Sequence, residues 1–586
     1  MKQTVASRFQ SSLQILCSII VISAQAVVAA NRPNVVLVMT DDQGYGDLRC
    51  HGNSMIKTPN LDRLHSQSVR LTDFHVDPTC SPTRAALLTG RYSTRTGVWH
   101  TVMGRSILFD DEVTMAQMFA AAGYHTGIFG KWHLGDNYPA RPQDRGFHEV
   151  MIHGGGGVGQ TPDYWGNDYF DDTYLQNGEW RKQSGYCTKV FFDHAMDFVE
   201  ANRERPFFCY IPTNVPHSPN NVAEEYSRPY LNQGVPQNMA TFYGMITEFD
   251  ENMGRLMKRL DELGLSDNTI LIFMTDNGTA AGVYWHRGKG PAPRWKGFNA
   301  DMKGAKGSHW DGGHRVPFFI RWPNGGLTGG RDVNRLTAHI DVLPTLAELC
   351  DVAPPAGRFL DGLSVVSLLR GRESNWPNRT LFAHFQREEI PPKWTRSVAM
   401  TERWRLIDGE QLFDIKADPG QQTNVAPRHG DVVKRLRADY EKWWKSLESR
   451  FEKHGWIVLG TEHENPSMLT CHDWHLHDTG KIPWNQAHIE KGLASNAYWM
   501  VDFAQAGTYE FTLRQKPAVA AFPIEATAAS VSVGNRETLG AVPPDSTSVT
   551  LTMEVTAGRK RMQATFDNEA DGTSRGAYFV EVRRVN

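Results

Sequence analysis

Residues Cys80 to Arg91 combine a potential nucleophile with groups that bind an anion. Pro82 fits the first turn of a helix, the next residues are good helix formers, and Gly90 suits the left-handed position just past a helix end. Cys80 would then lie at the helix N-terminus, where free N–H groups and the helix dipole favour an anion. Arg84, one turn later, would fork onto the same anion. A lone cysteine at a helix start is more often a small core residue, so other residues must decide.

Two pairs of oxygen donors follow apolar runs elsewhere in the chain. Asp41 and Asp42 follow the run ending at Met39, and Asp276 and Asn277 follow the run ending at Met274. A set of oxygen donors without cysteine or histidine suits Ca²⁺ or Mg²⁺ and not zinc. A turn after a strand would explain one pair alone, whereas two matching pairs favour a metal site.

Cationic and proton-transferring side chains follow two further apolar runs. Lys131 and His133 come after the run 124–129, and His217 comes after the run 207–211. Lys306 ends a basic, glycine-rich loop that begins at Trp285. A lone histidine usually makes a structural hydrogen bond, so these residues become informative only if the fold brings them together.

The elements between these residues predict how they are positioned. The mostly apolar stretches 35–39, 207–211 and 269–274, and the stretch 124–129, are predicted to be strands, and segments with helical spacing separate them. This alternation predicts an open α/β sheet with right-handed crossovers. Open α/β sheets bind ligands at the carboxyl ends of their strands, so we expect the four polar clusters to meet beside the Cys80 helix.

The stretch at Cys80 also resembles the signature of the sulfatase family, in the alkaline phosphatase superfamily. The family pattern is Cys-x-Pro-Ser/Thr-Arg followed by Leu-Thr-Gly-Arg, and this chain has Cys80-Ser-Pro-Thr-Arg84 and Leu88-Thr-Gly-Arg91. The resemblance implies that a formylglycine-generating enzyme oxidises Cys80 to Cα-formylglycine, which becomes the nucleophile. It also implies one Ca²⁺ ion, with the metal site formed by Asp41, Asp42, position 80, Asp276 and Asn277.

Two other stretches are similar to the second and third motifs of that family: Gly-Lys131-Trp-His133-Leu-Gly and Pro-His217-Ser-Pro. The resemblance implies that Arg84 and Lys131 hold sulfate oxygens and that Asp276 accepts the proton of the attacking hydroxyl. It implies that His133 takes a later proton and that His217 or Lys306 protonates the leaving alcohol. The pattern around Lys306 departs from the family, with Ala305 before it and Asp311 in place of a glutamate.

The length and texture of the chain predict several units. A chain of 586 residues is too long to fold around one hydrophobic core, so we expect two or more domains. We expect a signal peptide that directs export at residues 1–30. Residues 31–375 should form a large α/β domain, with a mixed, mostly parallel sheet between layers of helices. A small C-terminal subdomain should occupy 376–455. Alternating apolar residues with glycine and proline turns predict an all-β, sandwich-like module at 456–586.

The composition and the N-terminal residues restrict the class of partner and the cellular location that we expect for this protein. A formal net charge of -3 gives no argument for a nucleic-acid partner. Lys2 and Arg8 precede an apolar run from Leu16 to Val28, so we expect export to the periplasm or the extracellular space and no stable membrane insertion. The cysteines are scattered, which argues against a disulfide scaffold.

Three functions compete on these residues. The first is a sulfatase acting on a sulfated carbohydrate or an aryl sulfate. The second is a phosphonate monoester hydrolase or phosphodiesterase of the same superfamily. The third is a non-catalytic binder of sulfated glycan, which the intact Cys80, Arg84 and Asp276 argue against.

Three features outside these motifs have two readings each. Trp99-His100 and Tyr164-Trp165 either stack on sugar rings or pack inside loops. The loop Cys471–Asp478 is either a metal site or, as we favour, a hydrogen-bonded junction between domains. The β module is either a carbohydrate-contact domain or a stabilising cap.

Overall fold

The computed structural model describes residues 32–284, 295–476, 481–568 and 572–586. The expected signal peptide at 1–30 and the last two residues of the loop Cys471–Asp478 lie outside these ranges. Within them, none of the helices combines the length and apolar character that a bilayer crossing needs.

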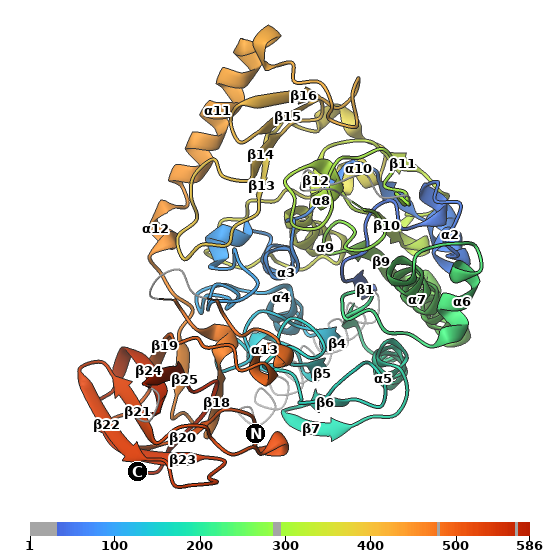
Figure 1. Cartoon of the computed structure of the whole chain (residues 1–586). Helices are drawn as coiled ribbons and strands as arrows, with labels where there is room; N and C mark the ends of the chain where they lie inside the picture. The colour runs from blue at the N-terminus through green and yellow to red at the C-terminus, as the bar shows by residue number, and fades with distance from the viewer. Residues whose placement is uncertain (1–31, 285–294, 477–480, 569–571) are drawn as a thin grey trace, which may run out of the picture.

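A ten-stranded sheet forms the centre of the molecule (Figure 1). Its five middle strands run parallel to one another, and antiparallel strands lie on both sides of them. This arrangement confirms the mixed, mostly parallel sheet expected from the apolar runs. In spatial order the strands are β11 (Asp332–Val333), β2 (Val69–Leu71), β10 (Phe318–Arg321), β9 (Thr269–Thr275), β1 (Asn34–Thr40), β8 (Phe207–Pro212), β4 (His125–Lys131), β5 (Glu149–His153), β6 (Thr173–Gln176) and β7 (Glu179–Lys182).

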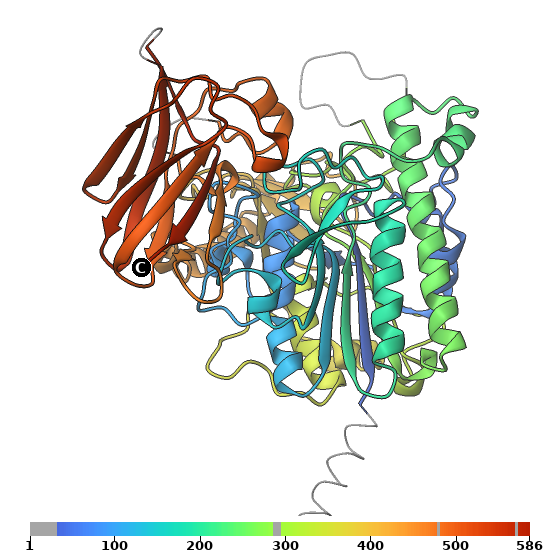
Figure 2. The ribbon, with the colours of Figure 1, turned by 90° about the horizontal axis from the view of Figure 1, so that it is seen from below.

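Helices cover both faces of this sheet, because successive side chains of each strand point to opposite faces. Val35 and Leu37 of β1 belong to one apolar cluster, and Val36 and Val38 belong to the other. Figure 2 shows the sheet between the two helical layers. The first cluster includes α3 (Cys80–Thr89), α4 (Met115–Ala121), α9 (Val342–Leu349) and α10 (Val366–Leu369), and the second includes α2 (Pro59–Gln67), α5 (Cys187–Ala201) and α7 (Gln237–Glu262).

The segment 151–190, which its glycine and polar content predicts as one long loop, contains a hairpin. Strands β6 and β7 pair across Asn177-Gly178, whose φ angles of 49° and 91° are left-handed. Asn-Gly is a favoured two-residue hairpin turn. The sequence pattern does not reveal the strands because each has four residues and β7 is exposed throughout.

A small antiparallel sheet follows, in agreement with the expected C-terminal subdomain. Strands β13 (Leu381–His384), β14 (Ser397–Met400), β15 (Trp404–Ile407) and β16 (Gln411–Asp414) pair in sequence order. Helix α11 (Gly430–Lys445) shares an apolar cluster with them. The amphipathic pattern predicts this helix at 432–447, within two residues of its observed ends.

The C-terminal part is the all-β module that the alternating pattern predicts. One sheet contains β17, β19, β24, β21, β22 and β25, the other contains β18, β26, β20 and β23, and one apolar cluster includes side chains from both. The strands are β17 (Ile457–Leu459), β18 (Ser467–Thr470), β19 (Trp499–Phe503), β20 (Gly507–Arg514), β21 (Ala528–Val533), β22 (Arg536–Ala541), β23 (Val549–Val555), β24 (Gly558–Asn568), β25 (Thr573–Gly576) and β26 (Phe579–Arg584).

The β module packs directly against the α/β part. Its apolar cluster contains four buried residues from that part: Val102, Met103, Ile107 and Ala140. The backbone N–H of Met103 also donates to the carbonyl of His472 over 3.1 Å. The module is therefore joined to the α/β part by a shared core as well as by the chain.

Candidate active site

The carboxyl ends of four adjacent parallel strands meet at one edge of the central sheet. Thr40 of β1 pairs with Thr275 of β9, so Asp41 and Asp276 lie side by side where the two strands end. Strand β8 flanks β1 on the other side, and β4 flanks β8. The register thus brings the polar clusters after β1, β4, β8 and β9 to one place, as strand periodicity predicts.

Cys80 is the first residue of α3 and is 3% exposed. The helix ends at Gly90, whose φ of 67° is the left-handed C-cap conformation expected from the sequence. The Cys80 thiol, an oxygen of Asp41 and an oxygen of Asp276 all lie within 4.8 Å of one another. The helix therefore places position 80 against the carboxylates at the sheet edge.

Salt bridges and hydrogen bonds link the buried carboxylates to three cations. Lys131 Nζ lies 2.7 Å from Asp41 Oδ2, and Lys306 Nζ lies 2.7 Å from Asp42 Oδ2. Arg84 donates from Nη2 to Asp276 Oδ2 over 2.8 Å. Because each carboxylate has its own cation, the burial of three acidic groups in one place is compensated.

The residues expected to bind a metal ion have buried oxygen atoms that a bound cation would satisfy. Asp41 Oδ1 and Asn277 Oδ1 are buried acceptor atoms without a hydrogen-bond partner among the described residues. Such orphaned oxygens are unfavourable unless a donor or a cation satisfies them. Asp42 beside them has a left-handed φ of 75°, a strained conformation that is found preferentially at functional sites. An oxygen-binding cation such as Ca²⁺ fits this set.

Arg84 is fully buried and contacts other site residues. Besides Asp276, it donates from Nη1 to the carbonyl of Lys131 over 2.9 Å. It is absent from the lining of the cavity described below. In this geometry Arg84 fixes the position of Asp276 and of the β4 end, and only its Nε atom is without a partner among the described residues.

The hydrogen bonds of two histidines define their tautomers. His133 Nε2 lies 2.8 Å from the carbonyl of Thr101, so Nε2 carries the proton and Nδ1, which has no described partner, keeps its lone pair. His217 Nδ1 lies 2.6 Å from the carbonyl of Ser218 and therefore carries its proton. Its Nε2 lies 3.9 Å from Asp42 Oδ2. Each ring thus has one nitrogen that is able to accept a proton.

The position of His133 requires a glycine opposite its ring. A Cβ atom on Gly156 would lie 2.2 Å from His133 Cε1, which excludes any side chain there. Gly156 belongs to the glycine-rich stretch Gly154–Gly157. The glycines of this loop therefore allow the backbone to approach the catalytic edge closely.

Burial and neighbouring charges shift the pKa values of the ionisable groups in the site. Burial raises the pKa of Asp276 to about 6, with the charge of Asp41 adding to the rise. Burial and then Lys306 lower the pKa of His217 to about 3. Burial opposes the charge of Lys306, but Asp42, Cys80 and Asp41 together outweigh burial and raise the pKa of that lysine. Without a bound anion, His217 is therefore neutral and Lys306 is charged at neutral pH.

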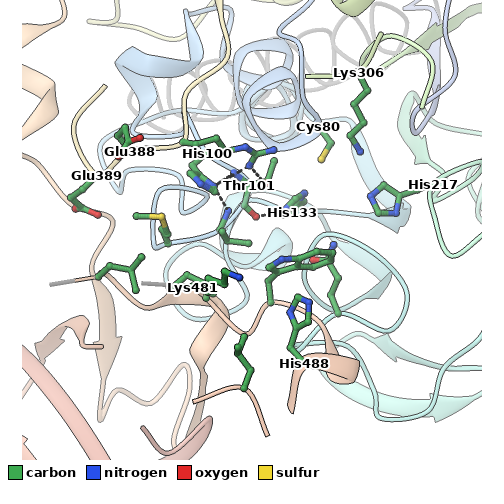
Figure 3. Close-up of a pocket in the computed structure, with 18 residues that line it drawn as sticks. Cys80, His100, Thr101, His133, His217, Lys306, Glu388, Glu389, Lys481 and His488 are labelled. Atoms are coloured by element: carbon green, nitrogen blue, oxygen red, sulfur yellow. Dashed lines mark hydrogen bonds between the residues drawn. The ribbon is translucent and has the colours of Figure 1, made fainter. Parts of the chain in front are cut away.

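A cavity of about 1250 Å³ opens above these groups (Figure 3). Of the residues predicted from the sequence, Cys80, His133, His217 and Lys306 line it, and the remaining ones lie buried behind them. The other lining residues are His100, Thr101, Val102, Met103, Gln160, Arg387, Glu388, Glu389, Leu476, Lys481, Ile482, Trp484, His488 and Leu493.

The sequence pattern does not predict most of the residues that line the outer part of the cavity. Arg387–Glu389 come from the C-terminal subdomain, and Lys481 and Trp484 come from the β module. Isolated charged or aromatic residues in loops have no spacing signal. A run of three charged residues near an aromatic residue, as in Arg387-Glu388-Glu389 after Phe385, is the nearest available signal, and such runs occur at many surfaces.

The aromatic pairs proposed for sugar stacking pack elsewhere. Trp99 is 1% exposed and donates from Nε1 to the carbonyl of Glu388, although its neighbour His100 lines the cavity. Trp165 packs against Phe579, and Tyr164 packs against Trp180. For Trp99, Tyr164 and Trp165 the packing interpretation holds.

The loop that begins at Cys471 makes hydrogen bonds across the junction between the domains. His475 Nδ1 lies 2.9 Å from Glu389 Oε1, and the same oxygen accepts a 2.7 Å bond from Arg105 Nη2. His472, Asp473 and Asp136 also lie close together at this junction. These contacts join the β module to both other parts of the molecule.

Comparison with protein families identifies the chain. A family model described as Sulfatase matches residues 33–352, more than half of the chain. The chain belongs to the sulfatase family. A second model, N-sulphoglucosamine sulphohydrolase, C-terminal, matches residues 306–445 of this sulfatase. The family makes it a sulfuric ester hydrolase, which confirms the resemblance read from the Cys80 stretch.

Individual relatives agree with the family. Human arylsulfatase A is 33% identical over 427 residues, covering 69% of this sulfatase and 80% of the relative. An N-acetylgalactosamine-6-O-sulfatase of Bacteroides thetaiotaomicron is 28% identical over 488 residues, covering 70% and 92%. Among solved structures, Ps i-CgsB in complex with k-i-k-neocarrahexaose has a TM-score of 0.61 at 28% identity, again covering 70% and 92%.

A phosphonate monoester hydrolase of Agrobacterium radiobacter has a TM-score of 0.51 at 22% identity, covering 72% of this chain and 96% of that structure. At this identity the likeness shows a common fold and nothing about the substrate. The shared fold is consistent with the superfamily that the sequence motifs indicate.

Proposed function

We propose that this sulfatase hydrolyses sulfate esters of a sulfated carbohydrate, with formylglycine made from Cys80 and one bound Ca²⁺ ion. The observation that supports this most is Cys80 at the start of α3, beside two orphaned buried oxygens and at the base of a large cavity. Two relatives support a carbohydrate substrate. One is named an N-acetylgalactosamine-6-O-sulfatase, and the other was crystallised with k-i-k-neocarrahexaose.

Formylglycine at position 80 would supply a hydroxyl nucleophile, and Ca²⁺ held by Asp41, Asp42, Asp276 and Asn277 would polarise the sulfate. Asp276 is within reach of position 80 and, with its raised pKa, is suited to accept a proton there. Arg84 orients Asp276 through its 2.8 Å bond. Lys306 lines the cavity floor, where a sulfate would bind, and Lys131 lies buried behind it in a salt bridge with Asp41.

The two histidines are placed for proton transfer to and from the substrate. His133 lines the cavity with the lone pair of Nδ1 free of any described partner, which suits it to take a proton from the group at position 80. His217 Nε2 faces Asp42, near Lys306. A bound sulfate adds negative charge beside this ring and favours its protonated form, which would then donate a proton to the leaving alcohol.

A comparison of matched esters tests the proposed reaction. We expect kcat/KM for 4-nitrophenyl sulfate to exceed that for 4-nitrophenyl phosphate and for a phenylphosphonate ester. A screen of sulfated monosaccharides and oligosaccharides should then show release of inorganic sulfate. A preference for the phosphate or phosphonate ester would favour the phosphonate hydrolase alternative and remove the proposal.

Calcium is expected to stabilise the protein through Asp41. A ligand at a hundredfold excess over its Kd stabilises a protein by about 2.7 kcal/mol, so Ca²⁺ added to chelated protein should raise the Tm by about 2–4 °C. Asp41→Asn should remove most of that increment because it removes a charged ligand oxygen. Asp47→Asn, which changes a buried carboxylate of the same loop, should retain it. An increment unchanged by Asp41→Asn would exclude the proposed ligand set.

We further propose that residues 1–30 act as a cleaved export signal, on the basis of Lys2, Arg8 and the apolar run that follows. We also propose that the catalytic α/β domain comprises residues 31–375, the C-terminal subdomain residues 376–455 and the β module residues 456–586. Conversion of Cys80 would require a formylglycine-generating enzyme during maturation.

A further inference from the structure

One wall of the active-site cavity belongs to the β module. Lys481, Ile482, Trp484, His488 and Leu493 line the cavity together with Cys80 and His217. Figure 3 shows Lys481 and His488 across the cavity from Cys80, His217 and Lys306. Both family models end at or before residue 445, so this wall lies outside the part shared with them.

Hydrogen bonds hold this wall against the loop that approaches His133. The backbone N–H of Thr161 donates to the carbonyl of Trp484 over 3.0 Å, and that of Gln486 donates to the carbonyl of Gly159 over 3.0 Å. The side chain of Gln486 donates to the carbonyl of Gln160 over 3.1 Å and accepts from the N–H of Gly166 over 3.1 Å. The wall is therefore preorganised relative to the catalytic edge.

The exposed side chains of this wall are suited to an anionic sugar. Trp484 is 38% exposed, and His488 packs edge-on against its ring with the centroids 5.2 Å apart. An exposed indole face binds the C–H face of a sugar ring. Lys481 is exposed nearby and carries a positive charge that suits a sulfate or carboxylate group.

The size of the cavity supports a ligand larger than one sugar. Its volume of about 1250 Å³ lies above the usual range of roughly 300–1,000 Å³ for small-molecule sites. The sulfate ester must be at the Cys80 end, because the candidate nucleophile and the cations are there. A neighbouring sugar of the same chain would then extend toward the β module.

We propose that Lys481 and Trp484 form a second sugar subsite, which binds an anionic sugar residue next to the one that carries the scissile sulfate. This inference rests on the proposed function and specifies its substrate as an oligosaccharide or polysaccharide with repeated negative charge. Trp484 stacks on the ring of the neighbouring sugar, and Lys481 pairs with its sulfate or carboxylate.

Binding to a catalytically inactive Cys80→Ala protein tests the subsite. Titration calorimetry would compare N-acetylgalactosamine 6-sulfate with a chondroitin 6-sulfate tetrasaccharide, and galactose 4-sulfate with a carrageenan tetrasaccharide. At least one tetrasaccharide should bind about tenfold more tightly than its monosaccharide. Adding Lys481→Ala should weaken that tetrasaccharide about tenfold, as expected for the loss of a charged contact, and should weaken the monosaccharide much less.

Two further variants separate the subsite from a general disturbance of the module. Lys491→Ala changes an exposed lysine of the same segment that does not line the cavity, and tetrasaccharide binding should be unchanged. Trp484→Ala should lose about tenfold in affinity, and Trp484→Phe should retain most of it because an aromatic face remains.

The outcomes distinguish this inference from the proposed function. Equal affinities for the monosaccharide and tetrasaccharide of both pairs, or tetrasaccharide binding that is unaffected by Lys481→Ala, would overturn the subsite even if the native protein releases sulfate. Conversely, selective tetrasaccharide binding in a protein that hydrolyses no sulfate ester would support the subsite and remove the proposed reaction.

Discussion

Replacing Cys80 with alanine is expected to abolish turnover of every sulfate ester and to leave the fold intact. If position 80 supplies the nucleophile, its loss should lower kcat on the order of 10⁴-fold or more, as nucleophile deletions do in other hydrolases. The thiol is 3% exposed, and alanine differs from it by one sulfur atom, so little packing is lost. The measurements are kcat on 4-nitrophenyl sulfate and the Tm of both proteins.

Cys187 provides a matched control, since it is also buried and is the first residue of its helix, α5. Cys187→Ala should retain the kcat of the native protein. Peptide mass spectrometry of active protein should find position 80 without its sulfur and Cys187 unmodified. Full activity in protein that carries an intact thiol at position 80 would rule out the formylglycine mechanism.

His217→Ala is expected to lose far more rate on a sugar sulfate than on 4-nitrophenyl sulfate. A sugar alkoxide is a poor leaving group and needs a proton as the S–O bond breaks, whereas nitrophenolate leaves readily as an anion. General acid catalysis contributes about 10²–10⁴-fold, and only where the leaving group requires it. The comparison is kcat/KM for each protein on both substrates.

Two variants set the baseline for this comparison. His153 is buried like His217 and also contacts a neighbouring carbonyl through Nδ1, but it is not among the lining residues of the cavity. His153→Ala should therefore affect both substrates alike. Arg84→Ala should reduce both together, because Arg84 positions Asp276 for every substrate. Equal losses for His217→Ala on the two substrates would transfer the role of general acid to Lys306.

The centre of the fold is predictable because buried parallel strands have a strong sequence signature. The run at 35–39 is continuously apolar, the run at 269–274 is apolar after Thr269, and the structure extends each by a residue or two. Since parallel strands place their carboxyl ends at one edge, the meeting of Asp41 with Asp276 follows from that pattern. Short or exposed strands such as β7 have no apolar alternation, so the pattern misses them.

The outer cavity is not predictable by the same reasoning. Lys481 and Trp484 reach the site because the β module packs against the α/β part. Met103 of the α/β part and Trp474 of the module lie in one apolar cluster although they are far apart in the sequence. Periodicity describes the elements within a unit but contains no information about how two units dock. The role of Arg84 illustrates the same limit: its helix position is predictable, but its bond to the carbonyl of Lys131 depends on tertiary packing.

The apolar cluster shared by the two parts also sets an order of events during synthesis. Val102, Met103 and Ile107 leave the ribosome roughly 20–100 s before the module residues of the same cluster, at about 5–20 residues per second. During that interval the nascent α/β part has an uncovered apolar surface beside an incomplete cavity. A chain that terminates near residue 445 would keep that surface exposed and would tend to aggregate. Synthesis of the β module therefore covers this apolar surface and adds Lys481, Trp484 and His488 to the cavity wall.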